Sequence, residues 1–151
     1  MIKIITVGQI KEKYLKEAID EYLKRLKKYT NIIIIEVKDE GLVEPEKAIK
    51  IEAEKIQKHI QEKDYIVTLE IEGDEFTSTT FAKKLDTILI DNSNITFIIG
   101  GSYGLSDIIK RQAKLHLSFS KMTFPHQLFR VLLLEQIYRA YKINNNESYH
   151  K

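Results

Sequence analysis

Five short apolar runs alternate with longer stretches of helical periodicity, and this alternation limits the possible folds more than any other feature of the sequence. The runs cover residues 2–7, 31–37, 65–69, 95–99 and 116–119, and most are rich in β-branched side chains. Such runs are typical of strands, and strands separated by helices pair in parallel. We therefore expect an α/β fold in a single domain over residues 1–151, with a mainly parallel five-stranded sheet and helices on both faces.

The ends of these segments carry turn and capping signals. The run 31–37 is nearly continuous in apolar residues, which predicts a strand covered on both faces. Glu72-Gly73-Asp74 predicts the end of the third strand. Pro45 and Pro125 each predict the first turn of a helix, and Thr123 is the favoured N-cap of the second one. The other capping signals are Thr77-Ser78-Thr79 and Ser106-Asp107.

Apolar residues recur every three to four positions in the helical stretches, which indicates one buried stripe per helix. After Pro45 the stripe consists of Ile49, Ala53, Ile56 and Ile60. The last helix is apolar on nearly all sides. One side consists of Leu133, Ile137, Ala140 and Tyr141, and the opposite side of Leu128, Val131, Leu132 and Tyr138. We expect the sheet to cover the first side and a second copy of the chain, in a homodimer, to cover the second.

The 151 residues contain no cysteine, which excludes disulfide bonds, thiolate metal sites and cysteine nucleophiles. No apolar run is long enough to cross a bilayer and no signal-peptide cleavage site is present, so we expect a cytoplasmic protein without membrane contact. Residues 110–151 contain eight Lys and Arg residues but only two acidic ones, although the net charge of the whole chain is only +2. This asymmetry fits either a surface for a polyanion or ordinary solvated helix faces.

A glycine-rich segment, Gly100-Gly101-Ser102-Tyr103-Gly104, follows the fourth strand and holds three of the six glycines. Glycine lets the backbone turn sharply and approach a ligand closely. The spacing matches neither the dinucleotide fingerprint nor the Walker A motif. A tight turn between strand and helix is the alternative, but three glycines in five residues favour a ligand-binding loop that includes Gly100, Gly101 and Gly104.

A second candidate loop lies in residues 117–126, Leu-Ser-Phe-Ser-Lys-Met-Thr-Phe-Pro-His, where a strand leads through several hydroxyl side chains into a helix. A helix N-terminus beside hydroxyl groups suits a polar ligand, although an ordinary βα turn has the same outline. Because ligands bind beyond the carboxyl ends of parallel strands, we expect the loops after Leu69, Ile99 and Phe119 to form one site. The four histidines show no metal-ligand spacing, so we expect no metal site.

Together these segments resemble the ribosomal RNA large subunit methyltransferase H family, which belongs to the SPOUT class of knotted methyltransferases. The segments that carry the likeness are residues 98–104 and 117–126, Arg139-Ala140-Tyr141 and the closing Tyr149-His150-Lys151. The likeness covers essentially the whole chain, but some members end in Arg where this chain has Lys151. Lysine keeps the charge without the bidentate geometry of arginine.

The resemblance implies an S-adenosylmethionine-dependent enzyme that methylates N3 of a pseudouridine in 23S ribosomal RNA. It also implies a homodimer and a C-terminal trefoil knot, although knots are rare in proteins. By the same likeness, the cofactor pocket would include Leu69, Gly100 and a loop that consists of Phe119, Ser120, Lys121, Met122, Thr123 and Phe124.

Methylation at N3 requires loss of its proton, so a general base or a charge that favours the anion should lie near the target. The candidates are His126, Glu135, Arg139, Tyr149 and His150, and the sequence leaves open which of them takes the proton. Tyr149-His150-Lys151 combines an aromatic ring, an imidazole and a cation. We therefore expect the tail to hold the target nucleotide rather than the cofactor.

Two other functions agree with the sequence. One is a non-catalytic RNA-binding module that uses the basic C-terminal third, and the other is a flavodoxin-like nucleotide-binding domain. Binding of S-adenosylmethionine would distinguish the enzyme from the first, and a bound flavin would reveal the second.

Overall fold

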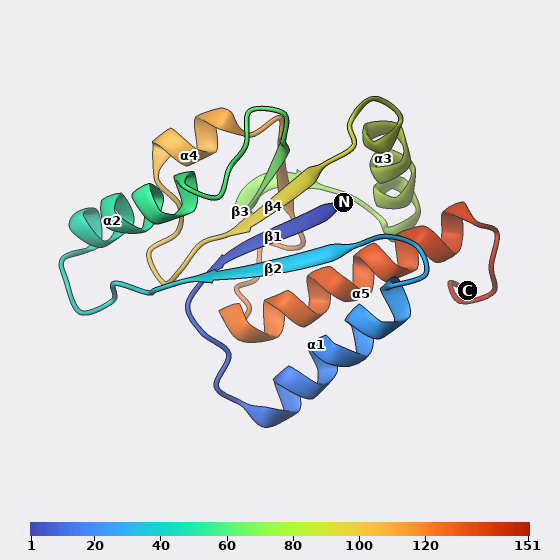
Figure 1. The fold of residues 1–151 in the computed structure, drawn as a ribbon, viewed down its shortest axis with the longest axis horizontal. Coiled ribbons are helices and arrows are strands. Elements are labelled where there is room, and N and C mark those ends of the chain that lie inside the picture. Colours follow the sequence, from blue (N-terminus) through green and yellow to red (C-terminus); the bar gives the residue numbers. More distant parts are fainter.

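The computed structural model describes residues 1–151 and contains one five-stranded sheet in the order β2-β1-β4-β3-β5 (Figure 1). The strands are β1 (Ile2–Val7), β2 (Ile32–Val37), β3 (Tyr65–Glu75), β4 (Ile95–Ile99) and β5 (Leu115–Ser118). Every neighbouring pair is parallel. The predicted α/β class with a mainly parallel sheet is therefore confirmed.

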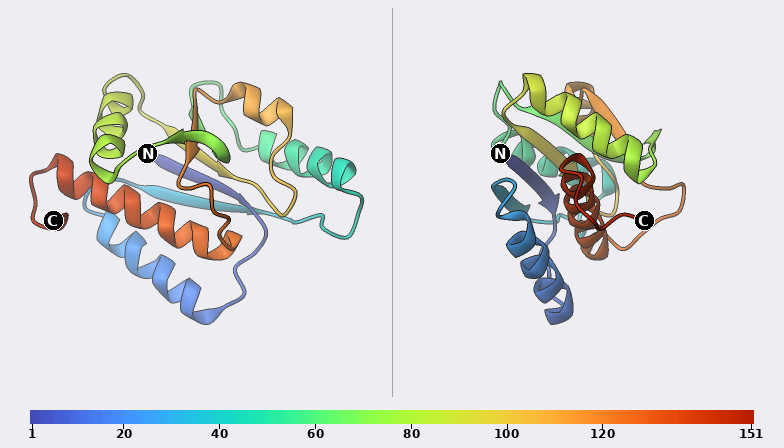
Figure 2. Two further views of the ribbon diagram at one scale, coloured as in Figure 1. Left: turned by 180° about the vertical axis from the view of Figure 1, so that it is seen from behind. Right: turned by 90° about the vertical axis from the view of Figure 1, so that its right-hand side faces the viewer.

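Helices cover both faces of the sheet, as predicted. One face packs against α1 (Lys13–Leu26), α3 (Ser78–Asp91) and α5 (His126–Asn144), and the other against α2 (Pro45–Gln57) and α4 (Asp107–Gln112). Two further views show the helices on either side of the strands (Figure 2). None of the helices combines the length and the apolarity that crossing a membrane requires.

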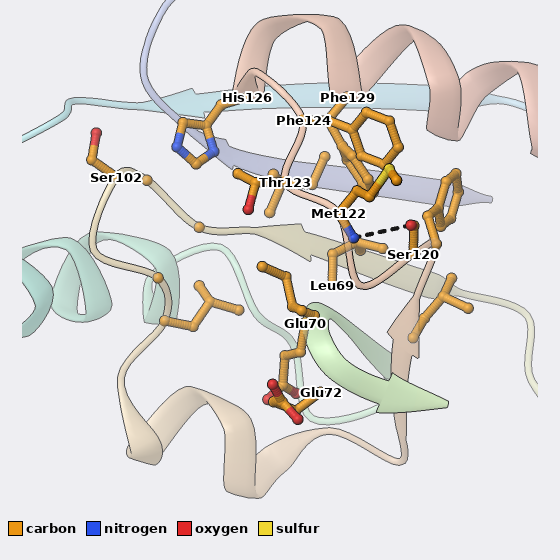
Figure 3. Close-up of a pocket in the computed structure, with 18 of the residues that line it drawn as sticks. Leu69, Glu70, Glu72, Ser102, Ser120, Met122, Thr123, Phe124, His126 and Phe129 are labelled. Carbon is orange, nitrogen blue, oxygen red and sulfur yellow. Dashed lines mark hydrogen bonds between the residues drawn. The ribbon is translucent and has the colours of Figure 1, made fainter. Parts of the chain in front are cut away.

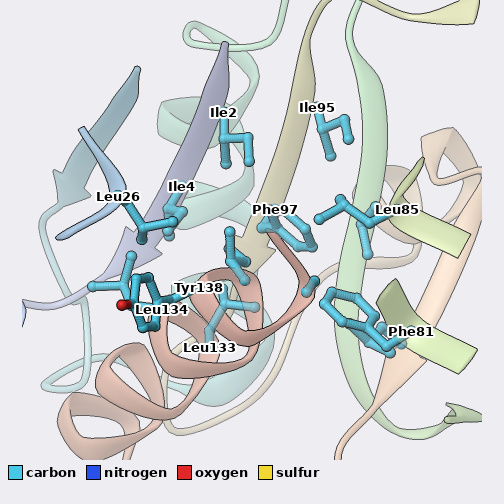
Figure 4. Packing of buried hydrophobic residues seen from close by; sticks show 14 of the residues in the cluster. Ile2, Ile4, Leu26, Phe81, Leu85, Ile95, Phe97, Leu133, Leu134 and Tyr138 are labelled. Carbon is cyan, nitrogen blue, oxygen red and sulfur yellow. The ribbon is translucent and has the colours of Figure 1, made fainter. Parts of the chain in front are cut away.

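The larger hydrophobic core lies between the sheet and the three helices of the first face (Figure 4). Successive side chains of a strand point to opposite faces, so Ile4 of β1 enters this core while Ile5 enters the smaller core under α2 and α4. Phe97 of β4 and Leu133 of α5 are almost completely buried in the larger core. Burial of each such side chain contributes roughly 1.5–3 kcal/mol.

The last helix, α5, packs against both α1 and α3. Leu133, Ile137 and Ala140 are fully buried, as predicted. Tyr138 was assigned to the opposite, outward side, and this assignment is wrong because its ring packs edge-on against Tyr22 of α1, with centroids 6.2 Å apart. The side that remains partly exposed consists of Leu128, Val131 and Leu132.

Two strand predictions are corrected by the sheet. Strand β2 lies at the edge, and Ile33 is 45% exposed, so β2 is not covered on both faces. Strand β3 does not end at Glu72-Gly73-Asp74 but continues to Glu75 through a register shift between Leu69 and Asp74. Gly73 permits this path, because a Cβ there would lie 2.6 Å from the carbonyl oxygen of His116.

Most capping predictions agree with the helix ends. Thr77 caps α3 in a capping box, Ser106 caps α4, and Pro45 occupies the first turn of α2. Thr123 is not the N-cap of α5, because Pro125 itself takes that position with an extended backbone. In α2 the buried stripe is Ala48, Glu52, Ala53 and Ile56, so the prediction is wrong for Ile49. Ile60 packs against the smaller core as an inward residue, although it lies beyond the end of α2 at Gln57.

Candidate active site

A cavity of about 560 Å³ lies where β4 and β5 end and β3 changes register (Figure 3). This volume falls within the usual range of small-molecule sites. Three segments that are far apart in the sequence line it, within residues 69–72, 99–105 and 117–129. The lining includes nine of the ten predicted cofactor residues: Leu69, Gly100, Gly101, Gly104, Phe119, Ser120, Met122, Thr123 and Phe124. The tenth, Lys121, is exposed and does not line the cavity.

The glycine loop folds back on itself at the cavity wall. Gly104 N–H donates to the carbonyl oxygen of Gly101 over 3.0 Å, which closes a tight turn. Gly104 has φ +81°, a conformation that disfavours residues with a Cβ. A Cβ at Gly100 would lie 2.8 Å from the backbone carbonyl carbon of Gly104. The loop therefore needs glycine at position 100 for close backbone approach and at position 104 for its dihedral angles.

The opposite wall combines aromatic rings with a hydroxyl-stabilised turn. The Ser120 hydroxyl accepts a 3.0 Å hydrogen bond from Met122 N–H, which shapes the loop after β5. The ring of Phe129 lies 4.8 Å from that of Phe119 and 6.1 Å from that of Phe124, centroid to centroid. These rings give the cavity a rigid apolar wall beside polar backbone.

An acidic edge of the cavity was not predicted from the sequence. Thr68 Oγ1 donates to Glu70 Oε2 over 2.6 Å, and His116 Nδ1 contacts the same oxygen. Burial would raise the pKa of Glu70, but the hydrogen bonds with Thr68 and His116 outweigh it and lower that pKa. Lys110 lies 3.7 Å from the other carboxylate oxygen. The register shift in β3 brings Glu70 to the cavity, and no local sequence signal marks it.

The five predicted catalytic residues fall into two places. His126, in the first turn of α5, lines the cavity. The other four residues are absent from its lining and gather further along α5 and in the tail: Glu135, Arg139, Tyr149 and His150.

These four side chains form one hydrogen-bonded cluster, which we call the tail cluster. Arg139 donates through Nε and Nη2 to the two oxygens of Glu135, over 3.2 and 3.0 Å. Tyr149 Oη donates to Glu135 Oε1 over 2.7 Å, and the Arg139 guanidinium lies 4.6 Å from the centre of the Tyr149 ring. Arg139 Nη1 lies 3.0 Å from His150 Nδ1. The tail is thus folded against α5.

Comparison with known proteins identifies the family. The model of a family described as predicted SPOUT methyltransferase matches residues 1–150. A ribosomal RNA large subunit methyltransferase H from Clostridium acetobutylicum is 51% identical, with 99% of each chain covered. Another, from Caldicellulosiruptor saccharolyticus, is also 51% identical, with both chains covered completely. The chain belongs to the ribosomal RNA large subunit methyltransferase H family of SPOUT methyltransferases.

Membership of this methyltransferase family favours the enzyme over the flavodoxin-like and non-catalytic alternatives. A solved structure of a probable methylase family protein from Haemophilus influenzae has a similar fold, with a TM-score of 0.56 at 13% identity. It covers 99% of this chain, and this chain covers 70% of it. Nowhere do three or more His, Asp or Glu side chains gather so that they could hold a metal ion.

One basic residue of this methyltransferase chain has a role that its charge did not predict. Arg130 counted toward the basic C-terminal third, but it is only 1% exposed and cannot meet a polyanion. Its Nη1 lies 2.6 Å from Glu36 Oε2, and its Nη2 donates to the Gly8 carbonyl oxygen over 2.7 Å. Arg130 therefore ties the start of α5, whose neighbours His126 and Phe129 line the cavity, to the ends of β1 and β2.

Proposed function

We propose that this chain is a cytoplasmic S-adenosylmethionine-dependent methyltransferase that methylates N3 of a pseudouridine in 23S ribosomal RNA. The observation that supports it best is the convergence of three distant segments on one cavity in a chain of this family. The names of the relatives, ribosomal RNA large subunit methyltransferase H, indicate the substrate class.

The lining of the cavity is suited to this cofactor. Phe119, Phe124 and Phe129 offer apolar aromatic surface, from rings tilted against one another, for contact with a nucleoside base. The glycine loop brings backbone polar groups close to a ligand. The carboxylates of Glu70 and Glu72 at the edge complement a positive charge. When bound, S-adenosylmethionine would supply a methyl group attached to a positively charged sulfur. The chain would contribute alignment of the reactants and exclusion of water.

The separation of the candidate groups along α5 supports a homodimer. A helix rises about 1.5 Å per residue, which puts Arg139 about 20 Å along the axis from His126. One chain therefore holds the cavity and the tail cluster far apart. A second copy packed antiparallel against the side of Leu128, Val131 and Leu132 would bring its tail cluster to this chain's cavity. In that arrangement the tail of one chain holds the target nucleotide at the cavity of the other.

Complementation would test this arrangement. Gly100→Val should block the cavity, and deletion of residues 148–151 should remove the tail. Each variant alone should be inactive, whereas mixed dimers carry one site with both an intact cavity and an intact tail and should regain activity. Light scattering that gives a monomer mass at micromolar concentration, or a mixture that stays inactive after subunit exchange, would contradict the shared site.

We include the C-terminal trefoil knot of the SPOUT class in the proposal. A knot that passes α5 through a loop of the chain would hold the two cavity loops together and make unfolding slow. Unfolding in guanidinium chloride at the rate of an ordinary domain of this size would argue against it.

The decisive experiment for the function is transfer of a tritiated methyl group from S-adenosylmethionine to ribosomes from a strain that lacks this protein. Label should appear in 23S ribosomal RNA, and mass spectrometry of nuclease digests should locate it on one pseudouridine. Ribosomes from a strain that contains the protein are the matched control and should accept little label. Binding of the cofactor without transfer to ribosomes, subunits or free ribosomal RNA would contradict the proposed substrate.

A further inference from the structure

The C-terminal end of α1 carries a concentration of positive charge that the cavity and the tail cluster do not use. Lys24, Arg25, Lys27 and Lys28 are all exposed. The acidic residues of this segment all precede them: Glu12, Glu17, Asp20 and Glu21. The earlier part of the segment also carries Lys11, Lys13 and Lys16 and is therefore nearly neutral, so α1 has a positive end at residues 24–28, next to β2.

This positive end lies beside the C-terminal end of α5, as Figure 1 shows for the two helices. Tyr29 Oη donates to Glu147 over 2.7 Å, and its ring stacks on that of Tyr141 at 5.4 Å. Lys142 and Lys28 share the other oxygen of Glu147, over 2.9 and 3.4 Å. We call the group Lys24, Arg25, Lys27, Lys28 and Lys142 the basic end.

The basic end continues into the tail cluster. The Arg25 guanidinium lies 5.8 Å from the centre of the Tyr138 ring, and the Tyr138 ring lies 5.0 Å from that of Tyr149. Cations and aromatic rings therefore alternate from α1 to the tail. Such interleaving is typical of surfaces that bind nucleic acid, where cations meet phosphates and rings meet bases.

Ion pairs within the chain leave this surface positive. Glu21 pairs with Arg25, and Glu147 is shared by two lysines. Lys24 and Lys27 form no ion pair, so their ammonium groups are free to meet a ligand. Free cations held on a rigid helix end are suited to phosphates at fixed spacing.

We propose that the basic end binds phosphates of the RNA strand next to the target nucleotide, while the tail cluster holds the nucleotide itself. This inference rests on the proposed function, because it takes ribosomal RNA as the substrate. It assigns sequence-independent affinity to α1 and leaves recognition of the base to the tail. The charge concentrated in residues 24–28 would then steer the enzyme onto RNA.

Two matched double variants test the proposal. Lys24→Gln with Lys27→Gln removes two free cations of the basic end. Lys47→Gln with Lys50→Gln removes two exposed lysines with the same spacing from α2, on the opposite face of the sheet. Both double substitutions lower the net charge equally, and none of the four lysines forms an ion pair with an acidic residue of the chain. Only the position of the lost charge differs.

The measurement is kcat/KM for methyl transfer to ribosomes from a strain lacking this protein, at KCl concentrations from about 50 to about 200 mM. At the lowest salt concentration, kcat/KM of the α1 variant should be roughly tenfold below that of the wild type. The slope of its log kcat/KM against log salt concentration should be shallower by about 1.4–1.8. The α2 variant should behave as the wild type. Calorimetry should show unchanged S-adenosylmethionine affinity in all three proteins.

Equal effects of the two double variants, or no change of slope in the α1 variant, would overturn the proposal. If the α1 lysines serve only the helix dipole, thermal stability falls while the salt slope stays the same. If the wild type transfers no methyl group, the proposed function fails, and cosedimentation with the same ribosomes tests the surface separately. If the α1 variant binds ribosomes with the same salt dependence as the wild type in this cosedimentation, the proposed phosphate-binding role of the basic end is also overturned.

Discussion

The hydroxyl of Tyr149 donates a 2.7 Å hydrogen bond to the carboxylate of Glu135 and so fastens the end of the chain to the middle of α5. Burial, followed by this hydrogen bond, raises the pKa of Tyr149 to about 12. The phenol therefore stays protonated at neutral pH and cannot accept the proton of N3. His150 Nδ1 accepts from Arg139 Nη1 over 3.0 Å, because a guanidinium only donates.

Removal of the tail should separate cofactor binding from catalysis. Deletion of residues 148–151 takes away Tyr149 and His150, which lie outside the cavity lining. We expect S-adenosylmethionine affinity within about twofold of the wild type and methyl transfer reduced by at least about a hundredfold, a loss typical of misplaced substrate. Calorimetry and the tritium assay measure the two quantities. Ser148→Ala, which keeps Tyr149, His150 and Lys151, is the control. Loss of cofactor affinity in the deletion would assign the tail to the cavity wall.

Gly100→Ala should weaken cofactor binding through the backbone. The added Cβ would lie 2.8 Å from the Gly104 carbonyl carbon, so the loop must shift at the cavity wall. We expect at least a tenfold loss of S-adenosylmethionine affinity by calorimetry. Gly104→Ala is the comparison, because its Cβ meets nothing within 4 Å but its φ of +81° costs roughly 1–2 kcal/mol of stability. Unchanged affinity in a folded Gly100→Ala protein would remove this loop from the site.

Arg130→Met should destabilise the fold. The change removes a buried guanidinium and leaves the Gly8 carbonyl without its donor, whereas Glu36 is partly exposed and still accepts from Ile10 N–H. A buried polar group that loses its partner typically costs about 1–3 kcal/mol. Urea unfolding measures the change. Arg111→Met, at an exposed position in α4, should change stability by no more than about 0.5 kcal/mol, and equal effects would show that Arg130 is dispensable.

The docking of the tail should weaken in acid. A hydrogen bond from Lys142, and then one from Tyr29, lowers the pKa of Glu147 from 4.5 to about 2. Because the pKa is lower in the folded state, the stabilisation is present above pH 4.5 and is lost as the pH falls toward 2. The difference between the Tm at pH 7 and the Tm at pH 3 should therefore be smaller for Glu147→Gln than for the wild type. Glu62→Gln, at an exposed position without an ion pair, should keep the wild-type difference.

Several parts of the fold were predictable because their causes are local. The β-branched run of Ile32–Val37 and the side-chain cap of Thr77 follow from residues within a few positions of each other. The glycine loop was recognisable because positive φ and close backbone approach require glycine. The alternation of strands and helices then restricted the sheet to parallel pairing, which collected the loops after β4 and β5 at one edge.

The remaining features depend on contacts between distant residues. Nothing in the composition of β2 reveals that it lies at the sheet edge, since strand order is set by how the crossing helices pack. Arg130 reads as a surface cation until Glu36, 94 positions away, is placed beside it. Likewise Glu70 becomes a cavity residue only because β3 changes register against β5.

The same distinction applies to the candidate site. Residue type and spacing along the chain were enough to select His126 and the tail cluster, because their chemistry is a property of the side chains themselves. The sequence did not reveal that His126 lies at the cavity while the tail cluster lies at the far end of α5, because this placement depends on tertiary packing. A straight helix keeps its two ends apart whatever its sequence, and only the packing of α5 against α1 and α3 determines which residues each end meets.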